Sequence, residues 1–146
     1  MSREISFYMT NKELLNKKYS EDSWIGDDST FYDSFTMGSI QAHCLAVIPD
    51  NKETVITLSH IKEMFEKVEE MRADIKRDKA VYKTILQARN TSDDEIFEAA
   101  KGLAEYDEDL ECLAYAKSFI KQLETLVKVF NDEDNKLDLQ LIGYIG

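Results

Sequence analysis

The sequence predicts the α+β class, with a small, mainly antiparallel sheet packed with a long antiparallel helical hairpin. The first observation is the segment Thr57–Arg89, which has helical periodicity and contains no Gly or Pro. A second helical region follows it, and three segments with strand character come from the N-terminus, the middle and the C-terminus of the chain. A length of 146 residues is typical of one domain, so we expect residues 1–146 to form a single α+β domain.

The charge balance restricts the kinds of partner. The chain has 29 acidic and 18 basic residues, a net charge of -11, which disfavours direct binding to nucleic acid or to an anionic membrane. Its longest purely apolar run, Cys44–Ile48, is far shorter than the roughly 20 residues that span a bilayer, and no basic segment leads into an apolar one at the N-terminus. We therefore expect a soluble, cytoplasmic protein. In such a reducing compartment Cys44 and Cys112 are expected to be free thiols rather than a disulfide.

The N-terminal segment predicts a strand followed by a short helix. Between Glu4 and Met9 apolar residues recur at every second position, as expected of a strand with one buried face. Thr10 and Glu13 have the spacing of a capping box, so a helix is predicted from Asn11 to about Tyr19.

The next segment, Ser20–Gly38, has the composition of a loop but contains Trp24 and several other aromatic residues. Large rings bury much apolar surface when they pack, so this loop is expected to be held against the rest of the protein. Two interpretations remain open. The rings close one end of the core, or Trp24 and nearby carboxylates form an exposed recognition surface, because aromatic residues are typical anchors of interfaces. The carboxylates in the second interpretation are Asp22, Asp27, Asp28 and Asp33.

Two further strands are predicted. Ser39–Ile48 is apolar on both faces towards its end, which favours a buried strand in the middle of the sheet. Pro49–Asn51 ends that strand with turn residues, and Val55 and Ile56 are either a brief strand or the lead into the long helix. Alternating leucines from Leu137 onward, ending near Ile145, predict a final strand.

The long helix begins at Thr57, a good N-cap residue, with Ile56 and Ile61 at the spacing of a hydrophobic staple. Such a helix, ending near Arg89, is about 50 Å long at 1.5 Å per residue, so an equally long element must pack against it. Its apolar stripe, interrupted only at Asp78, is made of Ile61, Met64, Val68, Met71, Ile75, Tyr82 and Ile85.

The second helical region begins with good capping chemistry. Ser92 and Glu95 have the spacing of a capping box, and carboxylates crowd the first turn, where the helix dipole favours them. The apolar stripe slips between Tyr106 and Leu113, so the region is either one kinked helix or two helices. We favour two, over residues 93–105 and 107–130, returning antiparallel along the first helix.

No arrangement typical of catalysis or metal binding is found in the sequence. His43 and His60 lie on different predicted elements, and no Cys or carboxylate stands at metal-ligand spacing from either. There is no glycine-rich phosphate loop, nucleophile elbow or Ser/His/Asp signature. We therefore expect a protein that is not an enzyme and that has no cofactor and no bound metal.

The distribution of charge gives the leading functional hypothesis. Residues 90–116 contain nine acidic residues and one lysine, and carboxylates three or four positions apart on a helix lie roughly 5 to 6 Å apart, close to the phosphate spacing of nucleic acid. We expect an inhibitor or regulator whose acidic, nucleic-acid-like surface binds a basic protein, with nucleic-acid-binding proteins as one class of target. The predicted partner-binding residues are Asp93, Asp94, Glu95, Glu98, Glu105, Asp107, Glu108, Asp109 and Glu111, with Trp24, Asp27 and Asp28.

Two alternatives stay open at this point. The acidic surface serves solubility alone, which is common among soluble proteins. Alternatively, the protein is a structural or scaffolding homo-oligomer, such as a homodimer, assembled through the helical hairpin. Its near-heptad seam from Ile61 to Ile85 favours pairing of helices, although Asp78 interrupts that seam.

Overall fold

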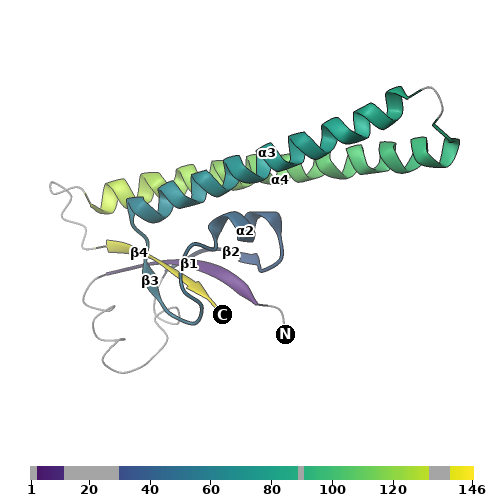
Figure 1. The fold of residues 1–146 in the computed structure, drawn as a ribbon. Helices are drawn as coiled ribbons and strands as arrows, with labels where there is room; N and C mark the ends of the chain where they lie inside the picture. The colour runs from purple at the N-terminus through teal and green to yellow at the C-terminus, as the bar shows by residue number, and fades with distance from the viewer. Residues whose placement is uncertain (1–2, 12–29, 89–90, 132–138) are drawn as a thin grey trace.

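A four-stranded antiparallel sheet and a long helical hairpin form the fold, which is α+β as predicted (Figure 1). The computed structural model describes residues 3–11, 30–88, 91–131 and 139–146. The elements are β1 Glu4–Asn11, β2 Thr30–Thr36, α2 Ile40–Leu45, β3 Thr54–Val55, α3 Leu58–Gln87, α4 Asp93–Phe130 and β4 Leu139–Ile145.

The sheet has the order β2-β1-β4-β3, so the first and last strands of the chain lie side by side at its centre. Residue Ile5 of β1 faces Phe35 of β2 on one side and Ile145 of β4 on the other. The predicted N-terminal strand is confirmed and extends to Asn11, so no helix begins there as predicted, and the rest of that predicted helix lies outside the described residues. The predicted C-terminal strand is confirmed over Leu139–Ile145.

The sheet has four strands rather than the predicted three: two of the predicted strands are present, and β2, in the segment predicted as a loop, and the short β3 are added to them. Strict alternation is missing from β2 because its register against β1 shifts between Phe7 and Tyr8. That shift leaves Tyr32 without a residue opposite it, and its ring stacks on Phe119 of α4 at 5.6 Å between centroids. Phe35 of β2 also meets Phe119, edge to face at 4.8 Å. Tyr32 and Phe35 therefore pack against the core, as the first interpretation expected of the rings in this segment, whereas Phe31 is 56% exposed.

The predicted central strand Ser39–Ile48 is wrong, because the chain forms the short helix α2 there. Ser39 caps this helix by accepting a hydrogen bond from the backbone N–H of Ala42 at 3.1 Å, after a turn at Gly38 with a φ of 97°. A short apolar run fits a buried helix as well as a buried strand, and here the cap decides the outcome. Of the two alternatives left open for Val55 and Ile56, the brief strand is the one present, as β3 over Thr54–Val55, and Ile56 follows it.

Helix α3 begins where the sequence predicts. Thr57 is the N-cap, and its Oγ1 accepts a hydrogen bond from the backbone N–H of His60 at 3.4 Å. The ring of His60 replaces the usual Glu or Gln of a capping box, since its Nδ1 accepts a hydrogen bond from the backbone N–H of Thr57 at 3.0 Å.

Helix α4 is one helix, Asp93–Phe130, not two helices that meet at Tyr106. Tyr106 and Leu110 both pack towards the core, although the spacing of the apolar residues changes between Tyr106 and Leu113. Asp107 starts no new helix; its carboxylate pairs with Lys79 of α3. An exposed carboxylate is easily tolerated within a helix, so acidic residues in this region do not require a break.

The hairpin lies across one face of the sheet and continues well past its edge (Figure 1). The apolar core, where β1, α2, β4 and the hairpin meet, reaches along the hairpin as far as Ile75 and Tyr106. From about this level outward the two helices form a projection, called the arm below, made of residues 76–87 of α3 and 93–111 of α4, with Tyr106 and Leu110 at its junction with the core. None of the helices described here has a stretch both long and apolar enough to cross a membrane.

Candidate protein-interaction surfaces

The two helices of the arm are held together by a small set of contacts. The ring of Tyr82 lies so close to Gly102 that an added Cβ would stand 2.9 Å from its Cζ, so a residue without a side chain permits this approach. Tyr82 also meets Tyr106, with ring centroids 5.7 Å apart. The hydroxyl of Tyr106 donates to Asp78 at 3.4 Å, and Lys79 forms an ion pair with Asp107. Burial and then the negative charge of Asp78 raise the pKa of the Tyr106 phenol.

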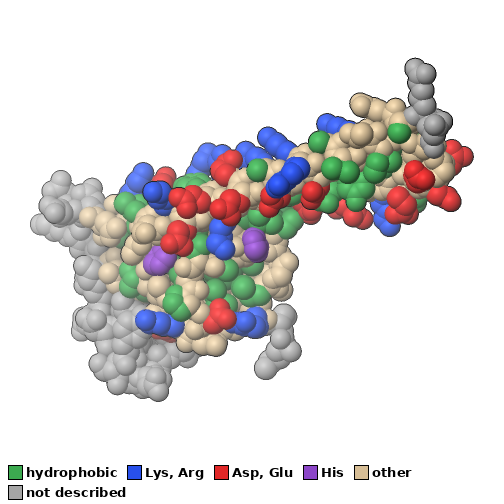
Figure 2. All heavy atoms as spheres, viewed as in Figure 1, with side chains coloured by type: hydrophobic (Ala, Val, Ile, Leu, Met, Phe, Trp, Pro, Cys, Tyr) green, Lys and Arg blue, Asp and Glu red, His purple; other side chains and the backbone are tan. Residues whose placement is uncertain are grey.

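The nine predicted partner-binding carboxylates between Asp93 and Glu111 all lie on the arm, along α4. Figure 2 shows acidic side chains gathered along the lower edge of the arm and at its far end. Only Asp109 is half-buried. The exposed ones are Asp93, Asp94, Glu95, Glu98, Glu105, Asp107, Glu108 and Glu111.

These carboxylates are largely uncompensated. Within the described part of the chain, Asp107 is the one member of the set that has an ion pair. The part of α4 in the arm has nine carboxylates and Lys101, whereas the part of α3 has three lysines, one arginine and one aspartate, so the arm carries a net charge of -5. Two of those lysines, Lys76 and Lys83, are exposed and make no ion pair within the described residues, so the two flanks of the arm differ in sign.

Large apolar side chains are also exposed on the arm. Phe97 is 66% exposed in the first turns of α4, between acidic positions, and Ile96 is 40% exposed beside it. On α3, Val81 is 59% exposed. Exposed Ala100 and Ala104 follow Phe97 at three and seven positions, so they share one flat face of the helix with it. Aromatic residues are typical anchors of interfaces, and this one lies among carboxylates.

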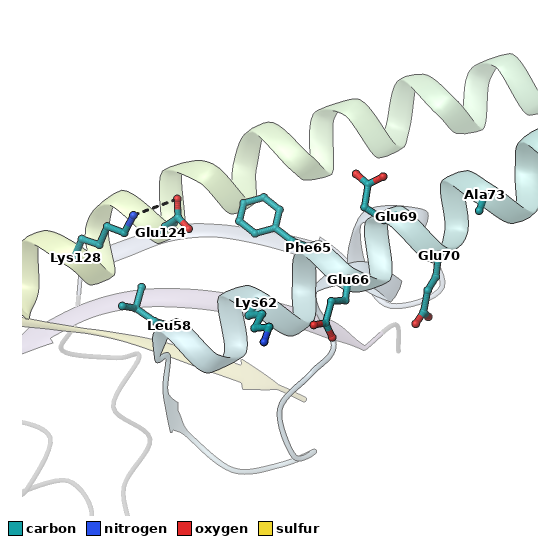
Figure 3. A pocket seen from close by; sticks show the side chains of 9 residues that line it. All are labelled: Leu58, Lys62, Phe65, Glu66, Glu69, Glu70, Ala73, Glu124 and Lys128. Atoms are coloured by element: carbon teal, nitrogen blue, oxygen red, sulfur yellow. Dashed lines mark ion pairs between the residues drawn. The ribbon is translucent and has the colours of Figure 1, made fainter.

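A separate groove runs along the base of the hairpin, on the face turned away from the sheet (Figure 3). Its volume is about 840 Å³. Figure 3 shows Phe65 and Glu69 pointing towards α4, whereas Lys62, Glu66 and Glu70 lie along the outer side of α3. The lining is completed by Leu58 and Ala73 of α3 and by Glu124 and Lys128 of α4.

Some of the charges in this groove are paired and others are not. Glu69 is 3.5 Å from Lys117, and Glu124 is 3.6 Å from Lys128. Among the described residues, Lys62, Glu66 and Glu70 make no ion pair. The groove therefore combines an apolar floor with one unpaired lysine, Lys62, near its Leu58 end. Two unpaired glutamates, Glu66 and Glu70, lie farther along α3 towards the arm.

Of the other predicted recognition residues, only Asp33 lies within the described part of the chain. Trp24, Asp27 and Asp28, like Asp22, lie outside the described residues. Asp33 lies on β2, where its carboxylate accepts a hydrogen bond from the backbone N–H of Ser34 at 2.8 Å.

Cysteines and histidines do not converge within the described part of the chain. Cys44 and Cys112 are both free, with Cys44 buried. His43 is exposed on α2, whereas His60 caps α3. Within residues 3–11, 30–88, 91–131 and 139–146, no three His, Cys, Asp or Glu side chains are grouped so as to hold a metal ion.

Neither the exposure of Phe97 nor the groove was predicted from the sequence. The groove has a weak signal in the sequence, because Leu58, Phe65 and Ala73 recur at spacings of seven and eight on a stripe separate from the buried one. The charged residues between them hide that stripe.

No family model matches the chain, no curated protein matches its sequence, and no solved structure matches its fold.

Proposed function

We propose that the protein is a non-enzymatic binding module, an inhibitor or regulator that uses its acidic arm to bind a basic protein. A nucleic-acid-binding protein is the class of target that fits best, because its binding site already accepts a row of negative charges. The chain's own net charge of -11 adds long-range attraction to such a site.

One observation carries the proposal: eight of the nine carboxylates that α4 contributes to the arm have no ion pair within the described residues, and seven of these eight are exposed. A carboxylate already paired within its own chain gains little from a new cation, whereas an unpaired one is available to a partner. The arm also stands clear of the sheet, so a large partner reaches it without meeting the rest of the described chain (Figure 1). Phe97 would add an apolar contact among the carboxylates near the start of α4.

The test uses a labelled Lys- and Arg-rich helical peptide as a basic probe, with binding followed by fluorescence anisotropy at increasing salt. Two double variants make the same change in net charge: Glu98→Gln with Glu105→Gln on the arm, and Glu4→Gln with Glu63→Gln away from it. We expect the arm variant to bind about 3 to 10 times more weakly and the control variant to bind almost as the wild type does. Wild-type affinity should also fall steeply with salt.

Equal losses in the two variants would mean that the probe responds to total charge, and the arm would not be the binding surface. An affinity that does not change with salt would reject the electrostatic basis of the proposal altogether. A second readout addresses the target class. Labelled duplex DNA bound to a nonspecific DNA-binding protein should be displaced by the wild type, and less well by the arm variant.

A further inference from the structure

We propose that the groove at the base of the hairpin binds a second copy of the chain, giving a two-fold dimer in which the two α3 helices lie antiparallel. The inference does not depend on the acidic arm. It concerns the opposite end of the hairpin and the face turned away from the sheet (Figure 3).

The first argument is the apolar floor of the groove. Leu58 is 44% exposed, Phe65 is half-buried, and Ala73 is exposed, and all three line the groove. From Leu58 to Ala73 this stripe is roughly 22 Å long, about four turns of helix. Two antiparallel helices with an apolar seam between them have the shape that receives a further helix.

The second argument is the order of charges along the outer side of α3. Lys62, Glu66 and Glu70 follow one another at intervals of four, so they form one row. Lys62 precedes Glu66, the less favourable order for a pair within a helix, and no ion pair forms between them. The row therefore has a free cation at one end and free carboxylates at the other, within the part of the chain that the structure describes.

An antiparallel copy of the same row matches this order. When the two-fold axis passes near Phe65 and Glu66, Lys62 of each copy faces Glu70 of the other, and Leu58 faces Ala73. The two Phe65 rings meet near the axis and fill the centre of the groove. A uniformly basic partner would instead place a like charge against Lys62, whereas a second copy supplies both signs in the required order.

The dimer has a consequence for the arms. Each arm continues its own α3 away from the axis, so the two tips point in opposite directions, roughly 65 Å apart at 1.5 Å per residue. Such a dimer offers two separate acidic surfaces instead of one combined surface.

The test is a charge swap followed by analytical ultracentrifugation over concentrations from micromolar to millimolar. The single variants Lys62→Glu and Glu70→Lys each set like charges against each other at two symmetric places, so we expect dimerisation to weaken about tenfold or more. The double variant Lys62→Glu with Glu70→Lys restores opposite charges and should recover the wild-type dissociation constant. Glu66→Gln should tighten the dimer, because Glu66 lies close to its own copy at the axis.

The matched control is Glu63→Lys, an exposed charge reversal outside the groove, which should leave the dimer unchanged. Thermal unfolding of each variant checks folding, and the milder changes Lys62→Gln and Glu70→Gln replace any reversal that fails to fold. Three results would overturn the proposal. These are a wild type that stays monomeric throughout, a dimer unaffected by either single reversal, and a double variant that dissociates as readily as the singles.

Discussion

Cys44 is the residue whose surroundings change its chemistry most clearly. It lies on α2, fully buried, with its Sγ 3.6 Å from the Sδ of Met71 on α3. Burial raises the pKa of its thiol from 9.0 to about 11, although the charge of Lys67 acts in the opposite direction. A thiol with so high a pKa stays protonated at neutral pH, so its place in the core depends on packing rather than on reactivity.

This pKa predicts how stability changes at alkaline pH. Between pH 9 and 11 the unfolded chain releases the Cys44 proton while the folded chain retains it, so the free energy of unfolding falls as pH rises. The loss approaches 2 to 3 kcal/mol at most, from about 1.4 kcal/mol per pKa unit. Urea unfolding at several pH values should show the difference between wild type and Cys44→Ala shrinking above pH 9. A difference that stays constant with pH would contradict the assigned burial.

At the scale of elements, the pattern of apolar residues determined most of the fold. The buried stripe of α3 at Ile61, Met64, Val68 and Ile75 follows the predicted spacing, because a helix that covers a sheet must bury one face. The short segments were harder, since a six-residue segment such as Ile40–Leu45, with four apolar residues, fits a helix or a strand equally well, and the cap at Ser39 is what distinguishes them. The β-bulge likewise hid β2, because alternation is lost where the register shifts.

The candidate surfaces were predictable only in part. The acidic residues were identified because nine of them are concentrated in one segment of the sequence. Whether they form ion pairs depends on where Lys79 and the other cations lie in space, which the sequence does not show. Phe97 stands beside Ile96 in the sequence, and a single aromatic residue forms no pattern that shows whether it is buried, so its exposure is visible only in the structure. The groove depends on α4 lying beside α3, and the stripe of Leu58, Phe65 and Ala73 is only a weak signal of it in the local sequence.

A prediction at this scale concerns strand β4, which lies between β1 and β3 and is covered by core side chains. Gly143 faces Phe7 of β1 and Thr54 of β3, and a Cβ there would stand 2.9 Å from the Cδ1 atoms of both Ile48 and Ile56. We expect Gly143→Ala to lower the free energy of unfolding by about 1 to 2 kcal/mol through overpacking, as measured by urea denaturation.

A double-mutant cycle separates this overpacking from other effects. Ile56→Val removes one of the two opposing Cδ1 atoms, so Gly143→Ala should cost less in that background, by about 0.5 kcal/mol or more. Strictly additive costs would show that the added methyl group is accommodated in some other way.

At the scale of the whole molecule, stability and exposed charge are separated along the hairpin. Its base packs on the sheet and α2, where Val68, Leu113 and Ile120 are fully buried. The arm has few buried apolar side chains, with Ala99 among them, and it concentrates unpaired carboxylates that repel one another. The surface proposed for binding therefore lies on the part of the hairpin with the least packing to stabilise it.

This separation predicts uneven amide hydrogen exchange along the two helices. Amides of residues 76–87 and 93–105 should exchange at least 30 times faster than those of residues 61–75 and 113–127, as expected if opening the arm costs about 2 kcal/mol less than global unfolding.

Tyr82→Ala should speed exchange in the arm and leave the base unchanged, because the Tyr82 ring joins the two helices at Gly102 and Tyr106. The control is Tyr115→Ala, an exposed ring against Phe35 near the sheet, which should leave exchange in the arm unaltered. Equal protection in arm and base would mean that the hairpin opens only as a unit. Since a basic partner would neutralise the repulsion within the arm, its binding should slow exchange there first.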